Sequence, residues 1–334
     1  MARKSRAAFL CLALGGTLCG RMCEGPTRFL PQEVRIGQSS PAAVGSGEFS
    51  LFRMGVFNFE GTPWFATMIK RFNFRSGSSG IFLGGNVRQW WQNLNPYIDD
   101  VNARMEKVSN VLSEVPLVAL QEVFQTEHAV RMLARSGHDV GLLADARRSD
   151  FVSRLWCTNC SGLSLFARRA EGKVLAWGWQ AFRHCSGFFS RGSDCLATKA
   201  VQWALLRLPN GALVYVLNTH LDAGGRDGMT RDSQLAEIRE LKKELRARAR
   251  DAAFVIAGDF NSEGAAEVLG MTDLARTDAW PRGVAVKGDS PRIFFQNGEC
   301  TRIAPRAGAF LVPSYVISDH ELLVGDFEVL SRCL

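Results

Sequence analysis

The strongest constraint on the fold is a series of short apolar segments that alternate with helix-like segments along most of the chain. These segments are rich in Val, Ile, Leu and Phe and are too short for typical helices, which favours buried strands. Four of them run directly into polar residues, at Asn58, Glu122, Asn218–His220 and Asp259–Asn261. A fifth polar group, Asp319–His320, precedes the last apolar segment. Polar residues at strand ends, where loops meet a rigid sheet, are typical of binding sites on layered α/β folds.

The order of the segments indicates an α/β fold of mixed strands and helices. Apolar residues at three- and four-residue spacing predict one helix over 94–112 and another from Thr230 through Leu245. The expected strands lie at 51–59, 116–124, 174–182, 199–208, 212–222, 254–262 and 321–329.

The N-terminal region has the layout of a targeting leader. MARKSR is basic, and the apolar run AAFLCLALGGTLCG ends in small residues and is too short for a bilayer span, as in secretory signal peptides. We therefore expect a signal peptide over 1–20, a disordered spacer or transit segment over 21–47, and one domain over 48–334. The leader predicts a secreted or lumenal protein, with organelle targeting through a bipartite leader as the alternative. No other stretch approaches the length of a transmembrane helix.

Composition narrows the choice of partners. With 334 residues, of which 46% are hydrophobic and 22% charged, the chain can bury a full core, and we expect a monomer. The net charge is +7, but residues 1–47 hold six Lys and Arg against two Glu, so the remainder carries only +3. A surplus this small gives little support to a nucleic-acid-binding groove.

Seven of the nine cysteines lie beyond the expected signal peptide. In an oxidising compartment the local candidates for disulfides are Cys157–Cys160 and Cys185–Cys195, and the odd count leaves at least one free thiol. The CTNC spacing at Cys157 also occurs in zinc sites. Such sites need a second pair of ligands, which the sequence lacks, so we give a zinc site little weight.

Taken in order, the polar motifs resemble those of the endonuclease/exonuclease/phosphatase superfamily, the deoxyribonuclease-I-like proteins. The matching pieces are VFNFE, LQEVF, NTHLD, GDFN and SDHELL, which follow family order over residues 50–330. The resemblance implies a four-layer α/β sandwich, in which two packed mixed β-sheets are flanked by helices. It also implies metal-dependent attack of water on a phosphoester.

The resemblance assigns the cation and the proton transfer to particular side chains. Glu122, with Asn58, would hold Mg²⁺ through oxygen ligands, with Mn²⁺ as the alternative cation. His320 would act as general base toward the attacking water, a role worth about 10²–10⁴-fold in rate. His220 would donate a hydrogen bond to a phosphoryl oxygen.

Three further catalytic assignments follow from the same resemblance. Asp259 and Asn261, in the GDFN motif, would orient the water and the phosphate. Asp319 would support the site from beside His320. The polar pair that precedes the last strand therefore has a chemical reason to be there, since it would direct an imidazole into a phosphate pocket.

One departure concerns the aspartate that in the superfamily orients the catalytic histidine, within a RIDYIF-like or DRILY-like strand. The corresponding stretch is GDSPRIFFQNG, in which Phe294 or Pro291 takes its place, depending on the register. Asp289 would substitute if the strand is regular there. Without this acid, one restraint on the tautomer and the orientation of the His320 ring is missing. A catalytically impaired lipid- or phosphate-binding protein is therefore an alternative to an active enzyme.

A closer resemblance, to the neutral sphingomyelinase branch, comes from DCLATKA, which is similar to a D-x-L-A-x-K-G element with Ala200 in place of the glycine. It implies substrate binding by Asp194 and Lys199, to which we add Asn218 of NTHLD. The alternative is a loop salt bridge worth under about 1 kcal/mol. The implied partner is a phospholipid such as sphingomyelin at a membrane surface, which Phe188–Phe189 could enter.

Other substrates remain open at this point. A nuclease or abasic-site endonuclease of the same fold would use the same chemistry with nucleic acid as its partner. An inositol-polyphosphate phosphatase is less favoured, since its tryptophan–cysteine–aspartate–arginine motif is absent from GDSPRIFF.

Overall fold

The computed structural model places a large part of the chain between residue 49 and residue 333. The described residues are 49–59, 101–144, 157–186, 194–195, 197–223, 228–286, 291–311, 318 and 320–333. The expected signal peptide and spacer lie outside them, as do Asp289, Asp319 and Phe188–Phe189. The signal peptide and the domain boundaries therefore stay predictions.

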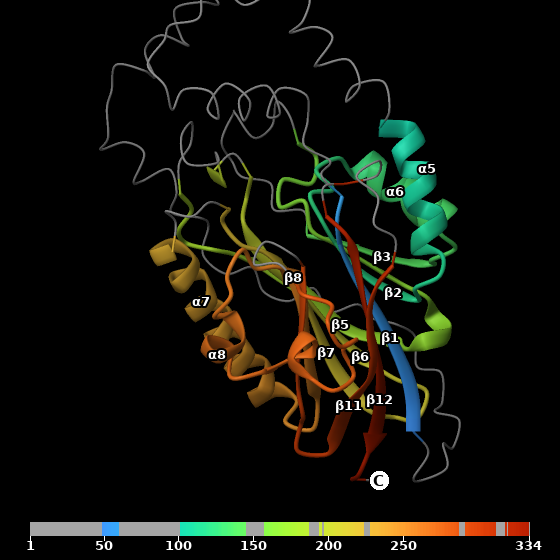
Figure 1. The fold of residues 1–334 in the computed structure, drawn as a ribbon, viewed down its shortest axis with the longest axis vertical. Helices are drawn as coiled ribbons and strands as arrows, with labels where there is room; N and C mark the ends of the chain where they lie inside the picture. The colour runs from blue at the N-terminus through green and yellow to red at the C-terminus, as the bar shows by residue number, and fades with distance from the viewer. Residues whose placement is uncertain are drawn as a thin grey trace, which may run out of the picture.

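The strands form two six-stranded sheets that pack face to face (Figure 1). The first sheet has the order β11-β12-β1-β2-β4-β3 and the second the order β5-β6-β7-β8-β10-β9. The strands of the first sheet are β1 (Phe49–Asn58), β2 (Leu117–Gln121), β3 (Val140–Leu143), β4 (Ser164–Ala167), β11 (Thr301–Leu311) and β12 (Leu322–Ser331). Those of the second are β5 (Lys173–Ala181), β6 (Ala200–Arg207), β7 (Leu213–His220), β8 (Ala253–Asp259), β9 (Thr272–Asp273) and β10 (Arg292–Gln296).

Helices cover the outer faces of the two sheets, α5 and α6 on one side and α7 and α8 on the other (Figure 1). Their bounds are α5 (Val101–Leu112), α6 (Thr126–Arg135), α7 (Gly228–Arg248) and α8 (Ala265–Leu269), with short 3₁₀ helices η2 (Arg169–Glu171) and η4 (Leu274–Arg276). The four-layer α/β sandwich that the resemblance implies is thus confirmed.

Alternation along the strands explains the layers, because successive side chains point to opposite faces. In β12, Leu323 and Phe327 enter the core between the sheets, whereas Leu322 and Val324 join the core beneath α5 and α6. The apolar stripe of α7 is buried against the second sheet at Leu235, Ile238, Leu241 and Leu245.

Each sheet contains one parallel pair of strands near its centre, β1 with β2 and β7 with β8, and the other pairings are antiparallel. Parallel strands end at the same edge of a sheet. Register places Asn58 beside Gln121 in the first sheet and His220 beside Asp259 in the second. Because β1 and β2 pack against β8 and β7, the two polar edges meet.

Three disulfides are present among the described cysteines. Cys157–Cys160 and Cys185–Cys195 confirm the two local pairs expected from the sequence. The third, Cys300–Cys333, joins the loop before β11 to the chain after β12. Its partners lie 33 residues apart, and spacing alone did not predict it.

Candidate active site

Six of the side chains singled out by the motifs come together where the parallel strands of both sheets end. Asn58 and His220 are the last residues of β1 and β7, and Asp259 is the last residue of β8. Glu122 directly follows β2, and Asn261 follows β8 after one intervening residue. His320 enters from the loop before β12.

Asp259 lies at the centre of the group and is only 2% exposed. Its Oδ2 accepts a hydrogen bond from Nδ2 of Asn58 at 3.4 Å, and the Nε2 atoms of His320 and His220 lie 3.7 and 3.9 Å from the same oxygen. Burial raises the pKa of the Asp259 carboxyl, while the nearby His320, Lys199 and Asn58 act in the opposite direction. One carboxylate therefore faces both imidazoles.

Glu122 is joined to this group through Asn58, whose Nδ2 also donates to Oε1 of Glu122 at 3.2 Å. The backbone of Glu122 has φ 58°, and that of Asn261 has φ 47°. Among the described residues, these are the two positions other than glycine with positive φ. Backbone strain of this kind clusters at functional sites, where the surrounding structure holds it in place.

His320 is held by a residue that the sequence reasoning did not select. The buried Ser318 donates from Oγ to the carbonyl oxygen of Asn58 at 2.6 Å and accepts from the backbone N–H of His320 at 3.1 Å. The serine thus ties the loop carrying the imidazole to the end of β1. A serine two residues before a histidine forms such turns often, and this was the available signal.

Lys199 approaches the group from the start of β6. Its Nζ donates to the carbonyl oxygen of Leu221 at 2.9 Å, and Nδ2 of Asn261 donates to the same oxygen at 3.3 Å. The backbone N–H of Asn261 donates to Oδ1 of Asp259 at 3.2 Å, which forms an Asx turn. Lys199 is therefore fixed beside the residues that follow β7 and β8.

Asp194 lies behind Lys199, and their charged atoms are 3.0 Å apart, with both side chains 6% exposed. The second carboxylate oxygen accepts from the backbone N–H of Ala223 at 2.9 Å. Burial outweighs the attraction of Lys199 and raises the pKa of Asp194 to about 6. The two residues do form a salt bridge, but it is buried, so the value of under about 1 kcal/mol that holds for exposed pairs does not apply to it.

Asn218 has a different place from the other expected site residues. Its amide is fully buried between the sheets, accepts from Nε2 of Gln121 at 2.7 Å and donates to the carbonyl oxygen of Leu120 at 3.0 Å. These bonds join β7 to β2. The amide of Asn218 is thus engaged inside the sandwich, whereas Lys199 and Asp194 adjoin the site.

The strand expected to carry the histidine-orienting acid has none. β10 reads RIFFQ, and its register places Arg292 beside Gly258, so Pro291 comes next toward Asp259. Phe294 packs against Phe260, with ring centroids 4.6 Å apart, in the core beneath α7 and α8. Neither alternative register therefore places an acid here, and Asp259 is the acid that faces His320 in the described part of the chain.

The donor set suits a hard divalent cation. Glu122 and Asp259 offer carboxylate oxygens and Asn58 an amide oxygen, the ligand types that Mg²⁺ prefers. Among the described residues, no group of three or more His, Cys, Asp and Glu is placed so that it could hold a metal ion by itself. Mg²⁺ is usually bound through one or two carboxylates and keeps several waters, so these residues fit it.

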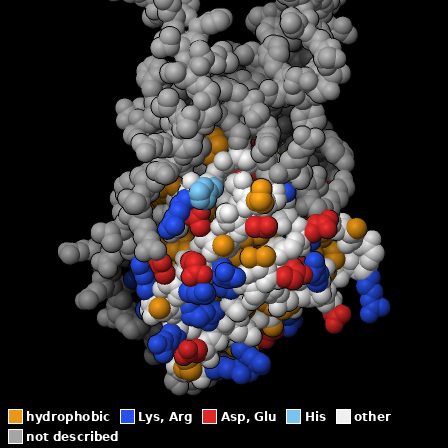
Figure 2. Space-filling view, turned by 90° about the vertical axis from the view of Figure 1, so that its left-hand side faces the viewer, with side chains coloured by type: hydrophobic (Ala, Val, Ile, Leu, Met, Phe, Trp, Pro, Cys, Tyr) orange, Lys and Arg blue, Asp and Glu red, His pale blue; other side chains and the backbone are white. Residues whose placement is uncertain are grey.

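Basic and acidic side chains are interspersed on the face that carries α7 and α8 (Figure 2). Ion pairs on this side include Lys243 with Glu240, at 2.9 Å, and Arg276 with Glu267. Such mixed charge is typical of a solvent-facing surface and not of a basic groove for nucleic acid. In the described part of the chain, no helix has the length and apolar character needed to cross a bilayer.

Known proteins resemble the chain in fold and, over a limited stretch, in sequence. An endonuclease/exonuclease/phosphatase family protein from Bacteroides thetaiotaomicron matches with a TM-score of 0.57 and 14% identity over 86% of this chain and 97% of that one. TDP2 from D. rerio, in complex with a single-strand DNA product, matches with a TM-score of 0.55 and 14% identity over 83% and 99%. No protein-family model matches the sequence.

One of the sequence matches is to the sphingomyelinase of Mycobacterium tuberculosis. It is 28% identical over 115 residues, which is 33% of this chain and 21% of the mycobacterial protein. The match thus spans about a fifth of the length of that relative. Together these findings confirm the resemblance drawn from the motifs: the chain has the deoxyribonuclease-I-like fold, and its sequence similarity supports the sphingomyelinase branch.

Proposed function

We propose that the protein is a phosphoester hydrolase, and more specifically a Mg²⁺-dependent phosphodiesterase that acts on sphingomyelin or a related phospholipid. The observation that carries the proposal is the arrangement around Asp259, whose one oxygen faces His320 and His220 and contacts Asn58 beside Glu122. Residues from both sheets contribute, so the whole fold builds the site.

In the proposed reaction His320 takes a proton from water as its oxygen bonds to phosphorus, and the phosphorus–oxygen bond to the lipid alcohol breaks. The departing alkoxide takes up one proton, which balances the proton that His320 later releases to solvent, and the lipid alcohol and the phosphorylated headgroup are released. His220 donates to a phosphoryl oxygen, and Asp259 fixes the orientation of the two imidazoles that face it. A divalent cation held by Glu122 and Asn58 would neutralise charge on the phosphoryl oxygens.

The choice of substrate class is supported by two observations. The mycobacterial relative is a sphingomyelinase. The buried Asp194–Lys199 pair, which belongs to the DCLATKA stretch that resembles the sphingomyelinase branch, adjoins the site. Secretion or a lumenal location also remains our proposal, and the three disulfides support it, because such bonds persist in oxidising compartments.

A nuclease is the second candidate. It is favoured by TDP2, which has this fold in a structure with a single-strand DNA product. The small surplus of +3 beyond residue 47 gives it little support.

The test is hydrolysis by the full chain with its disulfides intact. Sphingomyelin vesicles, single- and double-stranded DNA and inositol phosphates are offered in parallel, with Mg²⁺ or with chelator, and His320→Ala is the matched variant. We expect phosphocholine release that needs both Mg²⁺ and His320. DNA cleavage that needs both Mg²⁺ and His320 would support the same hydrolytic mechanism but would show that the substrate is nucleic acid and not lipid. A folded protein that is silent on every substrate would support the impaired, phosphate-binding alternative.

A further inference from the structure

The backbone at Glu122 needs an external restraint. A glutamate with φ 58° is in the left-handed region, which residues other than glycine, asparagine and aspartate rarely adopt. Such a conformation persists only where neighbouring groups over-determine it. The residues that supply the restraint therefore help to fix the position of the Glu122 carboxylate.

The restraint comes from residues Cys157–Leu163, which we name the CTNC loop. Nδ2 of Asn159, a fully buried side chain, donates to the carbonyl oxygen of Val123 at 2.9 Å and to that of Leu163 at 3.2 Å. The backbone N–H groups of Thr158 and Asn159 both donate to the carbonyl oxygen of Phe124, at 3.1 and 3.0 Å. Asn159 thus holds the two residues that follow Glu122.

Gly162 completes the restraint from the other side. Its carbonyl oxygen accepts from the N–H of Val123 at 2.9 Å. A Cβ at Gly162 would lie 3.1 Å from the Cα of Glu122 and 2.8 Å from the ring of Phe124, and the glycine itself has φ +68°. The loop therefore lies directly against the backbone of Glu122.

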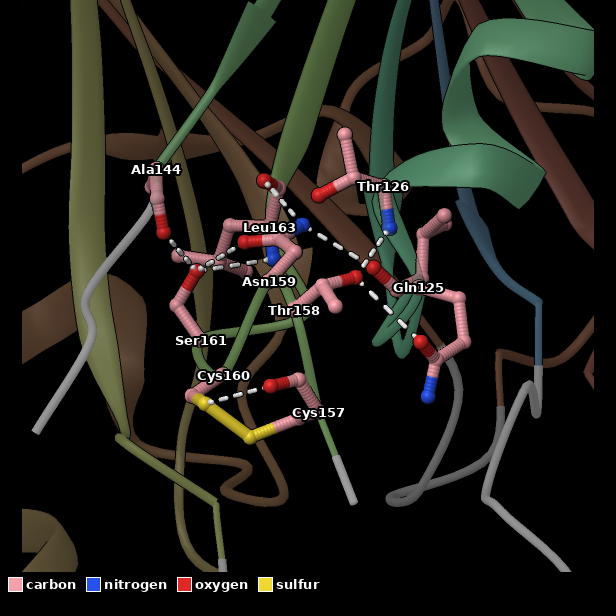
Figure 3. Close-up of a disulfide and its surroundings, with 10 residues drawn as sticks. Gln125, Thr126, Ala144, Cys157, Thr158, Asn159, Cys160, Ser161 and Leu163 are labelled. Carbon is pink, nitrogen blue, oxygen red and sulfur yellow. Dashed lines mark hydrogen bonds between the residues drawn. A yellow bond between two sulfur atoms is a disulfide. The ribbon is translucent and has the colours of Figure 1, made fainter. Parts of the chain in front are cut away.

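The CTNC loop is itself rigidly anchored (Figure 3). The buried Cys157–Cys160 disulfide closes it, and Oγ of Ser161 donates to the carbonyl oxygen of Ala144 at the end of β3. On the side of Lys199, the N–H of Thr198 donates to the carbonyl oxygen of Cys160 at 2.8 Å. The two sulfurs are bonded to each other, so the CTNC motif has a structural use here and not the zinc site considered from its spacing.

We propose that Asn159 is a positioning residue for the cation site, acting through the backbone of Val123 to hold Glu122. The proposal rests on the proposed function, in which Glu122 binds the divalent cation. Groups that orient metal ligands typically contribute 10–100-fold to metal affinity. Asn159→Ala, which cannot donate to Val123, is therefore expected to weaken cation binding by about 10-fold or more.

The experiment measures binding of Mn²⁺ alone to the chelator-treated full chain, from the electron paramagnetic resonance signal of the free ion. The matched control is Asn210→Ala, since Asn210 is also a buried asparagine, with Nδ2 donating to the carbonyl oxygen of Val329 at 2.9 Å. It precedes β7, at the opposite end of that strand from His220. We expect Asn210→Ala to lose stability but to keep the wild-type dissociation constant.

A dissociation constant for Asn159→Ala within about two-fold of wild type would overturn the proposal. If circular dichroism shows that Asn159→Ala does not fold, Gly162→Ala is measured instead, because the added Cβ would press on the backbone of Glu122. An unchanged Mn²⁺ dissociation constant for Gly162→Ala would equally overturn the proposal. Glu122→Gln tests the cation site itself, separately from the positioning role of Asn159. Wild-type protein that binds no Mn²⁺ would remove both the proposed cation site and this inference. Binding that needs Glu122 but not Asn159 would remove only this inference.

Discussion

Replacement of Asn218 by alanine tests whether the buried amides at the strand ends hold the two sheets together. The Asn218 side chain accepts from Gln121 at 2.7 Å and donates to the carbonyl oxygens of Leu120 and Ser164 at 3.0 and 3.1 Å. It also donates to Oε1 of Gln202 at 3.3 Å. Asn218→Ala removes all four bonds from a site that water does not reach.

The expected loss of stability can be worked out from the hydrogen-bonding partners of Asn218 that the substitution leaves unsatisfied. Leaving a buried polar group unsatisfied costs about 1–3 kcal/mol. Three of the four bonds, those with Gln121, Leu120 and Ser164, cross between the sheets. Their loss, with at least two groups left unsatisfied, is expected to lower the free energy of unfolding by about 2–6 kcal/mol. That is a large share of the roughly 5–15 kcal/mol by which domains are stable.

Urea denaturation followed by the fluorescence of the eight tryptophans measures the loss, with the disulfides kept intact. Asn110→Ala is the control, because Asn110 is exposed on α5 and alanine favours helix, so its effect should stay within about 0.5 kcal/mol. A loss below about 1 kcal/mol for Asn218→Ala, at an unchanged denaturant slope, would refute the assignment of the amide to sheet packing.

Three other perturbations have defined outcomes. Burial lowers the pKa of His138, so the stability that depends on its neutral form is present above about pH 6.5 and is lost as the pH falls. The urea midpoint of wild type should therefore fall between pH 7.5 and pH 5, and that of His138→Ala should fall less. An equal fall in both proteins would contradict this. The pKa of Asp194 is raised to about 6, so its contribution is present below its unfolded value and lost as the pH rises through 6. The stability of wild type relative to Asp194→Asn should therefore be greater at pH 4 than at pH 7.5, and a constant difference would count against a raised pKa. Replacing Cys300 and Cys333 together by serine opens a loop whose ends are 33 residues apart in sequence. In the chain-entropy model this lowers the free energy of unfolding by about 4 kcal/mol, which urea denaturation measures. A loss below about 1 kcal/mol would contradict the expectation.

The candidate active-site cluster was largely predictable from the sequence, because parallel strands bring their carboxyl ends to one edge. Apolar segments that each end in a polar residue therefore located Asn58, Glu122, His220 and Asp259 without any contact being known. The same rule could not separate Asn218 from its neighbours. Alternation turns its side chain inward between the sheets, and a polar residue that joins two sheets has the same sequence signature as one that faces a ligand.

Other features depended on contacts between distant segments. β11 was not predicted, since Pro305 interrupts its pattern; the strand lies at the edge of its sheet, where proline is tolerated, and its register shifts between Pro305 and Ala307. Ser318 needs the end of β1 as its partner before its role is visible. The Cys300–Cys333 disulfide likewise depends on β11 and β12 lying side by side.

The most direct test of the central claim compares sphingomyelin hydrolysis by wild type, Glu122→Gln and His320→Ala at saturating Mg²⁺. If the ends of the two parallel strand pairs form one metal-assisted hydrolytic site, each variant should keep its fold, and kcat/KM should fall by at least about 10²-fold. The double variant should then be little worse than either single variant, since the two groups act on the same step. Turnover near the wild-type rate in either folded variant would contradict the account.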